Sequence, residues 1–225
     1  MEQRYAELHA HSAFTFLEGT DEPAQMVAEA ARLGLDALAI LDVDGMYSTV
    51  QTTMAARDVG LPIAYGAELT LTPDSLRGII PGAQAPGWGL APGSDDPGIR
   101  LPVLAQSPGG YANLVGAMSE RALSAPGERN PCHSLVDLSV AGGDLIVLTG
   151  GRRGPLMRAL RAGGVPHARR VLDELADTFG RDQILVEWQA ARGDEDEVGD
   201  TLADLAHASG TRLVATTGAR MSTPS

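Results

Sequence analysis

Short apolar runs, bounded by turn residues, recur along this chain and predict β-strands. The predicted strands cover residues 5–9, 37–41, 101–105, 145–149, 184–188 and 213–216, with one or two more within 62–71. Between them, apolar residues spaced three and four apart predict helices. These helices cover a segment that begins near residue 21, and residues 48–59, 110–123, 155–160, 167–179 and 195–208.

The residues at the helix ends support this assignment. Thr20 or Asp21 is expected to cap the first helix, because both side chains accept hydrogen bonds from free backbone N–H groups. Pro23 fits the first turn of that helix, and Gly34 fits its end. Gly60 is expected to end the second helix in the same way.

The alternation of strands and helices predicts a parallel α/β sheet or barrel. One stretch interrupts the alternation: residues 73–98 are rich in Pro and Gly and show no periodicity. We interpret it as a mobile loop inserted into the fold. No internal repeat of fixed period is present, so the sequence predicts one α/β domain over residues 1–225, with an insertion at about 73–99.

The amino-acid composition excludes several classes of function. Apolar residues make up 44% of the 225 residues, enough to bury a core. The formal net charge of -12 repels the phosphate backbone of nucleic acids, so we expect only indirect contact with DNA. The single cysteine, Cys132, excludes an internal disulfide and suits a reducing cytoplasm. The chain shows neither a signal peptide nor an apolar run of membrane-spanning length, so a cytoplasmic location without membrane contact is expected.

Candidate chemistry gathers where predicted strands end. His9 and His11 lie two residues apart, so both imidazoles face the same side of a strand. Glu18 follows in a loop, and Glu68 lies in a later strand. Asp42 and Asp44 follow the second predicted strand. Because parallel α/β folds bind ligands at strand ends, these groups are a candidate metal site. A hydrogen-bonded histidine pair without metal is the alternative for His9 and His11.

The opening segment reads Tyr5-Ala6-Glu7-Leu8-His9-Ala10-His11-Ser12-Ala13-Phe14-Thr15-Phe16-Leu17-Glu18-Gly19. It resembles the first motif of PHP domains, the polymerase and histidinol phosphatase family. It is most similar to actinobacterial error-prone polymerases of the C family, the class of the DNA polymerase III alpha subunit. Weaker similarity continues through residues 30–39, 66–69, 109–114, 148–150 and 214–219, nearly the whole chain.

The resemblance implies a distorted (βα)7 barrel with up to three metal ions at the carboxyl ends of its strands. It implies phosphoester hydrolysis in active members, and in some polymerases a proofreading 3′–5′ exonuclease. Divalent ions there activate water and neutralise phosphate. The catalytic carboxylates of the polymerase itself would lie beyond residue 225, so the polymerase domains are expected to be absent from this chain.

Several ligand positions of the family are changed here. The family's Thr-Asp-His-Asp is Leu41-Asp42-Val43-Asp44, so Val43 replaces a histidine. The other departures are Arg100 for a histidine, Gly151 for a cysteine, Ala190 and Ala191 for a histidine pair, Arg220 for a histidine, and Thr217 or Gly218 for an acidic or amide residue. The resemblance leaves His9, His11, Glu18 and Glu68 as ligands for one divalent ion, zinc or manganese, or for no ion at all.

The two arginines suggest a replacement. A guanidinium from Arg100 or Arg220 would pair with Glu18 or Glu68 and take over the charge of a lost metal ion. The remaining polar residues are expected to have ordinary roles. Asp42 and Asp44 are expected to stabilise turns rather than bind metal, and surface positions are expected for His133, His167, His207, Arg152 and Arg153.

Three functional hypotheses follow. The first is a structural PHP domain of an error-prone DNA polymerase, acting in replication or translesion repair. Its site is degenerate, and its partners are polymerase domains of the same or a companion chain. The second is a free-standing phosphoesterase or exonuclease that depends on a divalent metal. The third is a regulatory protein whose altered pocket binds an anion or a partner, with Arg100 and Arg220 facing inward.

Overall fold

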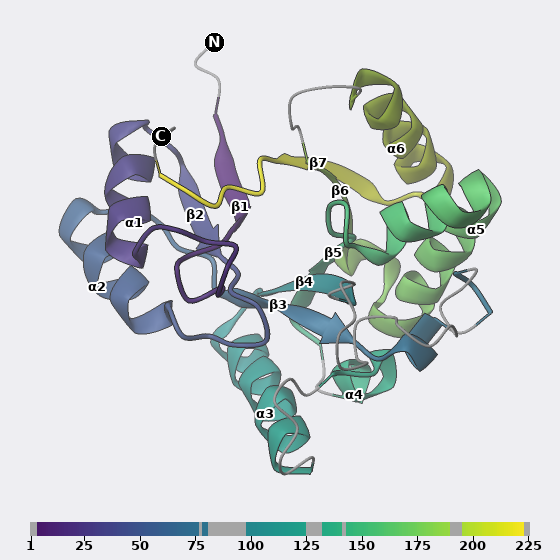
Figure 1. Ribbon diagram of the computed structural model, residues 1–225, viewed down its shortest axis with the longest axis horizontal. Helices are drawn as coiled ribbons and strands as arrows, with labels where there is room; N and C mark the ends of the chain where they lie inside the picture. The colour runs from purple at the N-terminus through teal and green to yellow at the C-terminus, as the bar shows by residue number, and fades with distance from the viewer. Residues whose placement is uncertain are drawn as a thin grey trace.

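The computed structural model describes residues 4–76, 78–80, 98–124, 132–140, 143–189 and 195–222. In these residues the strands run around a common centre and the helices lie outside them (Figure 1). The strands are β1 (Ala6–Ala10), β2 (Ala37–Ile40), β3 (Gly66–Leu71), β4 (Ile99–Ala105), β5 (Leu145–Leu148), β6 (Ile184–Gln189) and β7 (Arg212–Thr216). The helices are α1 (Pro23–Arg32), α2 (Thr49–Val59), α3 (Pro108–Ser124), α4 (Leu135–Val140), α5 (Pro155–Phe179) and α6 (Glu195–Ser209), with short 3-10 turns η1 (Pro73–Leu76) and η2 (Arg181–Gln183).

The strands form two sheets. β1 pairs with β2 in parallel, and the second sheet has the order β3-β4-β5-β6-β7. The prediction of a parallel sheet is confirmed for β5, β6 and β7 but was wrong for β4, which runs antiparallel to both β3 and β5. An alternating pattern gives the order of strands and helices but not the direction in which each strand enters the sheet. The register places Arg100 opposite Thr70, two residues from Glu68 along β3.

The two sheets meet without closing into one barrel over the described residues. Isolated bridges join Leu38 to Ile63 and Val43 to Glu68. At the other side, the backbone N–H of His11 donates to the carbonyl of Ala219 at 2.8 Å. The structure therefore confirms a mixed α/β fold, while its sheets stay open. This arrangement brings the ends of β1 and β2 and the segment after β7 to one region of the molecule.

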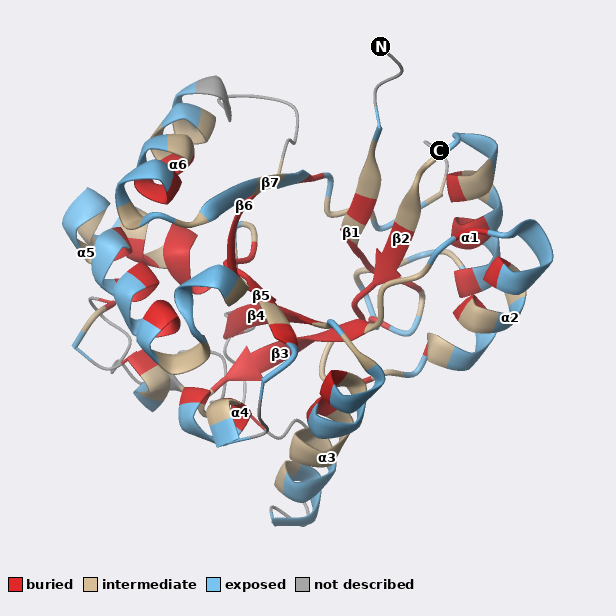
Figure 2. Ribbon diagram, turned by 180° about the vertical axis from the view of Figure 1, so that it is seen from behind, coloured by how far each residue is buried: buried red, intermediate tan, exposed pale blue. Residues whose placement is uncertain are grey.

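The core lies between the strands and the inner faces of the helices (Figure 2). All six residues of β3 are buried, and its two polar side chains, Glu68 and Thr70, are paired with His11 and Asp44. Leu156 and Leu172 of α5 are at most 1% exposed and pack in the same cluster as β3 to β6. Burial of each such leucine contributes about 1.5–3 kcal/mol, so α5 is held to the sheet mainly by its apolar face.

Helix ends differ in detail from the sequence-based assignment. Glu22, rather than Thr20 or Asp21, is the residue before α1, and its backbone N–H donates to the Gln25 side chain at 2.9 Å. The two helices predicted over 155–179 are both present and follow one another in α5, with a kink between them at Gly164, where the backbone is non-helical. α4 was not predicted, because six residues are too short for periodicity to show.

Some predicted features fall outside the described part of the chain. Most of the expected insertion, residues 81–97, lies there, as do Ala190 and Ala191. Among the helices that are described, none is long and apolar enough to cross a membrane.

Candidate functional site

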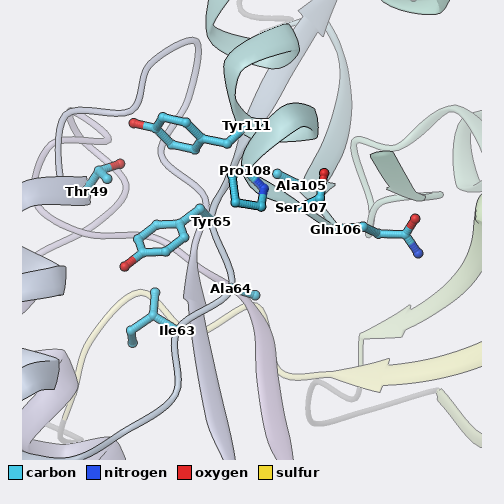
Figure 3. Close-up of a pocket in the computed structure, with 9 residues that line it drawn as sticks. All are labelled: Thr49, Ile63, Ala64, Tyr65, Ala105, Gln106, Ser107, Pro108 and Tyr111. Carbon is cyan, nitrogen blue, oxygen red and sulfur yellow. The ribbon is translucent and has the colours of Figure 1, made fainter. Parts of the chain in front are cut away.

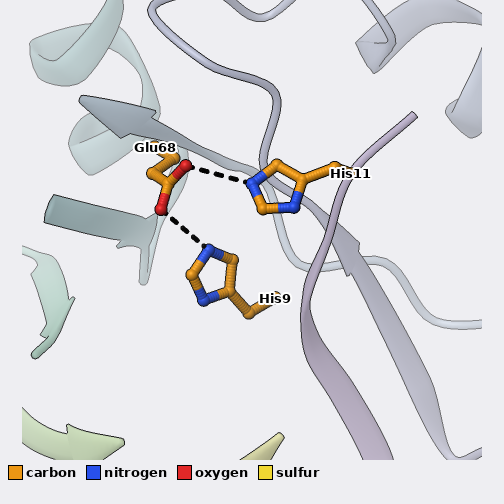
Figure 4. Close-up of side chains that lie close together, drawn as sticks. All are labelled: His9, His11 and Glu68. Atoms are coloured by element: carbon orange, nitrogen blue, oxygen red, sulfur yellow. Dashed lines mark hydrogen bonds and ion pairs between the residues drawn. The ribbon is translucent and has the colours of Figure 1, made fainter. Parts of the chain in front are cut away.

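Two histidines and one glutamate form the centre of the candidate site. His9 and His11 project from β1 and the residue after it, and Glu68 lies on β3. His11 Nε2 lies 3.1 Å from one carboxylate oxygen of Glu68, and His9 Nε2 lies 3.3 Å from the other. Figure 4 shows both imidazoles directed at this carboxylate. The sequence prediction that His9 and His11 face one centre is therefore confirmed.

A second glutamate, Glu187 on β6, orients His9 from the other side. Its carboxylate lies 2.7 Å from His9 Nδ1 and accepts a hydrogen bond from the Thr216 hydroxyl at 2.5 Å. The backbone N–H of Glu187 donates to the Thr149 hydroxyl. Sequence reasoning missed this residue. The available signal was a charged residue inside the apolar run of a predicted strand, which is stable there only when it is paired.

Mutual pairing sets the charges of these groups. Burial disfavours charged His9, yet the Glu187 carboxylate and then Glu68 raise the pKa of His9 well above its ordinary value. Burial likewise opposes the ionised form of Glu68, but its hydrogen bonds with His11 and His9 hold its pKa well below the usual range. Each group thus stabilises the charged form of its neighbour.

Glu18, the fourth predicted ligand, lies with arginines instead of histidines. Arg153 donates to Glu18 Oε1, and Arg100 Nη2 lies 3.6 Å from the same oxygen. Arg220 Nη2 lies 3.4 Å from Glu18 Oε2. Arg153 lies at the surface as expected, with its side chain 36% exposed, but its pairing with Glu18 was not predicted. The turn after β5 brings it to Glu18, a contact between residues 135 positions apart.

Arg100 connects the two halves of the site. Its guanidinium lies 3.4 Å from Glu68 Oε2 while it also faces Glu18, and its side chain is only 9% exposed. The hypothesis that arginines at changed ligand positions pair with Glu18 or Glu68 is confirmed for Arg100 and Arg220. A buried cation therefore stands between two of the four predicted ligands.

The two aspartates after β2 stabilise loops, as expected. Asp42 accepts hydrogen bonds from the backbone and hydroxyl of Ser12 and from the Thr15 hydroxyl, which fixes the loop after His11. Asp44 accepts from the backbone and hydroxyl of Thr70. Burial raises the pKa of Asp44. Both carboxylates are thus engaged beside the site without joining the histidine–glutamate group.

The remaining histidines divide between core and surface. His133 is only 2% exposed and bridges to Leu71, so its predicted surface position was wrong. The backbone explains its burial, because His133 exchanges hydrogen bonds with Thr70 and Thr72 beside β3. His207 is exposed as expected, and His167 is half-buried with its ring near the Gly163 carbonyl.

Gln189 fills space near His9 that glycines leave open. Its amide nitrogen lies 3.2 Å from His9 Nδ1 and 3.3 Å from Glu187 Oε1. A Cβ added at Gly151 would lie 1.8 Å from the Gln189 side chain, and one at Gly218 would lie 2.9 Å from it. A cysteine at Gly151 would therefore require Gln189 to move. Neither Gln189 nor its place beside His9 was predicted.

The donor set at the centre fits one divalent ion. His9, His11 and Glu68 each offer a ligand atom, and these atoms lie within 4.8 Å of one another. His11 Nδ1 is buried and makes no hydrogen bond with the described residues. Three protein ligands of this kind are typical of zinc sites that keep an open position. That these residues bind an ion, with or without Glu18, stays a prediction.

A separate pocket of about 430 Å³ lies elsewhere on the molecule. It lies between the start of α2, the segment before β3 and the turn from β4 to α3 (Figure 3). Tyr65 and Tyr111 line it with their rings edge to face, 6.0 Å apart between centroids. None of its lining residues belongs to the histidine–glutamate group.

The chain belongs to the PHP domain family, which matches residues 7–191. It is homologous to the N-terminal region of error-prone DNA polymerases. The relative from Mycolicibacterium paratuberculosis is 40% identical over 223 residues, which cover 98% of this chain and 19% of the polymerase. The relative from Nocardia farcinica is 37% identical, with 98% and 22% covered. The chain thus spans about a fifth of the length of these relatives.

The fold is shared with solved structures of low sequence identity. A protein from Bifidobacterium adolescentis, described as a metal-dependent phosphoesterase, superposes with a TM-score of 0.60. The superposition covers 96% of this chain and 88% of that protein at 15% identity. The family resemblance seen in the opening motif is therefore confirmed, and the structural likeness supports the fold.

Proposed function

We propose that this chain is a non-catalytic PHP domain that supports the polymerase domains of an error-prone DNA polymerase. One observation carries the proposal: the buried Arg100 guanidinium lies 3.4 Å from Glu68 and 3.6 Å from Glu18. Bringing a divalent cation to Glu68 would place it close to this fixed positive charge. An arginine that pairs with both carboxylates stabilises them in the absence of an ion.

The single-domain assignment over residues 1–225 belongs to the same proposal. Polymerase domains would be its partners, either in the same chain or in a companion chain, and any contact with DNA would pass through them. The relatives support this, since the matched segment is about a fifth of each polymerase.

A metal-dependent phosphoesterase is the second candidate, and the donor set favours it. His9, His11 and Glu68 would hold the ion, with Glu18 as a fourth ligand if its arginines moved away. A divalent ion at such a site supplies an activated water and neutralises phosphate charge. In this chain, Glu187 would orient His9 by accepting from its Nδ1–H, and Gln189 would close the site beside it.

Metal content separates the two candidates. We expect purified protein, dialysed against a weak chelator, to hold well under one equivalent of zinc or manganese by elemental analysis. We also expect no hydrolysis of an aryl phosphate when either metal is added. A full equivalent of metal together with turnover of the phosphate ester would reject the non-catalytic proposal.

Variants sharpen this test. Arg100→His removes the guanidinium that faces Glu68 and adds an imidazole at a position where the family has histidine, so we expect metal affinity to rise by about tenfold or more. Arg220→His removes a cation from Glu18 only, and a smaller increase is expected. Arg169→His, on the exposed face of α5, is the control for an added surface histidine. Equal affinity in all four proteins would show that the arginines do not oppose the metal.

A further inference from the structure

Six large apolar side chains lie exposed on the loop after β1 and at the start of α2. They are Phe14, Phe16, Leu17, Tyr47, Val50 and Met54, which we name the apolar patch. The loop and the helix lie side by side (Figure 1), and the rings of Phe14 and Tyr47 pack with their centroids 6.4 Å apart. The patch therefore joins two segments that are distant in the sequence.

The exposed side of α2 carries larger apolar side chains than its buried side. A surface helix normally turns its apolar side chains towards the core. In α2, Val50 and Met54 are 69% and 66% exposed, whereas Thr52 and Ala56 are buried. This arrangement is unfavourable in water, and a second protein surface that covers the exposed side would account for it.

The segments that form the patch contain no charged residue. Charged residues make up 20% of the chain, yet residues 12–17 and 45–56 include none. Depletion of charge, together with aromatic side chains and methionine, is typical of the buried centre of a protein interface. The composition therefore favours an uncharged, apolar protein surface as the partner, rather than nucleic acid or a charged peptide.

The loop after β1 holds Phe16 and Leu17 in defined positions. Asp42 accepts hydrogen bonds from the start of the loop, and a Cβ at Gly19 would lie 1.9 Å from the Ser12 carbonyl oxygen. Leu17 has a φ of 65°, which is unfavourable for a leucine, although its side chain is 89% exposed. Such local strain is often found where a residue has a role in binding. A fixed loop also loses little entropy when a partner covers it.

The relatives indicate which partner covers the patch. The region matched in the Mycolicibacterium paratuberculosis polymerase is N-terminal and makes up 19% of its length, so most of that polypeptide follows it. In the present structure, the segment after β7 is held against the loop after β1. The carbonyls of Ala219 and Arg220 accept hydrogen bonds from the backbone N–H groups of His11 and Thr20. A polymerase of this kind therefore continues towards its other domains from beside the patch.

We propose that the apolar patch is the docking surface for the polymerase domains that follow the PHP domain in these relatives. The face that covers it is uncharged and consists of aliphatic and aromatic side chains. The inference rests on the proposed function, because it takes polymerase domains as the partner.

Limited proteolysis of a full-length polymerase tests the proposal. In the parent fusion, this chain replaces the matched region of the Mycolicibacterium paratuberculosis polymerase, and primer extension verifies its folding. With Phe16→Ser/Leu17→Asn, we expect cleavage between the PHP domain and the polymerase domains to become about tenfold faster or more, because docking then buries less apolar surface. In the isolated chain, the same substitutions should leave thermal unfolding unchanged or raise its midpoint, because both positions are exposed and asparagine tolerates positive φ.

A second variant and a matched control make the test specific. Val50→Lys/Met54→Lys places charge on the α2 side of the patch and is expected to accelerate cleavage as well. Leu123→Ser/Val140→Ser, at exposed apolar positions of α3 and α4, should be cleaved like the parent fusion. Cleavage at the parent rate in both patch variants would overturn the proposal. Equal acceleration by the control would also overturn it, because any loss of exposed apolar surface would then have the same effect.

Sedimentation of the isolated chain separates polymerase domains from a second copy as the partner. We expect the parent chain and Phe16→Ser/Leu17→Asn to sediment alike, as monomers. A dimer of the parent chain that these substitutions dissociate would overturn the proposal in favour of a second copy.

This inference and the proposed function fail separately. Metal binding with turnover of a phosphate ester rejects the non-catalytic role, but it does not alter the cleavage test. Unchanged cleavage in the patch variants rejects the docking surface and leaves the structural role standing.

Discussion

At the residue scale, charge pairing determines the candidate site more than shape does. The Glu68 carboxylate pairs with His9, His11 and Arg100. The Glu187 carboxylate pairs with His9 and accepts a hydrogen bond from Thr216. Each of these groups is nearly excluded from solvent, so removal of one partner would leave a buried charge uncompensated. Arg100 is therefore part of a connected network of buried charges.

His133 allows a pH prediction away from this network. Burial lowers its pKa in the folded protein, whereas in the unfolded chain it titrates near about 6.5. As the pH falls through that value, the unfolded chain takes up the proton first, so His133 costs stability at acidic pH. The slope of unfolding free energy against pH is proportional to the number of protons taken up on unfolding. In His133→Gln, we expect this number to fall by up to about one between about pH 5 and 6.5.

Urea unfolding at several pH values measures this slope. His9, whose pKa is raised, acts in the opposite sense, but it is present in both proteins and cancels in the comparison. The exposed His207→Gln on α6 is the control and should leave the slope unchanged. Parallel curves for the parent chain and His133→Gln would contradict the prediction.

At the scale of elements, the apolar pattern located every predicted strand to within a few residues. β1, β2, β4, β5, β6 and β7 each match a predicted apolar run. Errors arose where the deciding contact is not local. The direction of β4, for example, depends on its pairing with β3 and β5, and nothing in its own seven residues encodes that choice.

Two glycines of α3 allow a paired prediction. A Cβ at Gly110 would lie 2.2 Å from the backbone carbonyl oxygen of Asp144, whereas one at Gly116 would meet nothing within 4 Å. We expect Gly110→Ala to destabilise the protein by about 1–3 kcal/mol, because α3 must move away from the turn before β5. Gly116→Ala should stabilise it by about 0.5–1 kcal/mol through helix propensity alone.

Chemical denaturation of the two variants measures the difference. Glycine-to-alanine substitution at these two positions of α3 is expected to change the free energy of unfolding in opposite directions. A general effect of alanine on the helix cannot produce that result. Similar stability changes in both variants would show that the close approach at Gly110 does not constrain the fold.

At the scale of the whole molecule, net charge leads to a prediction about DNA. Because its formal net charge is -12 at pH 7, the isolated chain should not bind duplex DNA measurably at about 0.15 M salt. At that ionic strength, attraction by a few basic side chains is screened beyond about 8 Å. Fluorescence anisotropy of a labelled duplex, repeated at lower salt, measures this. Binding that weakens steeply with salt would instead reveal a basic surface that acts despite the overall charge.

The sequence by itself determined the family, the strand and helix order, and the histidine pair that faces one centre. The family followed from the resemblance of the opening motif, whereas the element order and the histidine pair depend on local patterns: apolar periodicity, turn residues and the two-residue repeat of a strand. It also indicated that Arg100 and Arg220 would meet acidic groups, because the resemblance places them where metal ions would lie beside Glu18 and Glu68.

Only the tertiary structure decided which groups meet. Glu187, Gln189 and Arg153 lie more than a hundred residues from their partners His9 and Glu18, so no local pattern links them. Strand direction, the burial of His133 and the convergence of three arginines on Glu18 depend on how the sheets and turns pack together. The physical reason is that pairing energy between buried charges is set by distance and solvent exclusion, which exist only once the chain has folded.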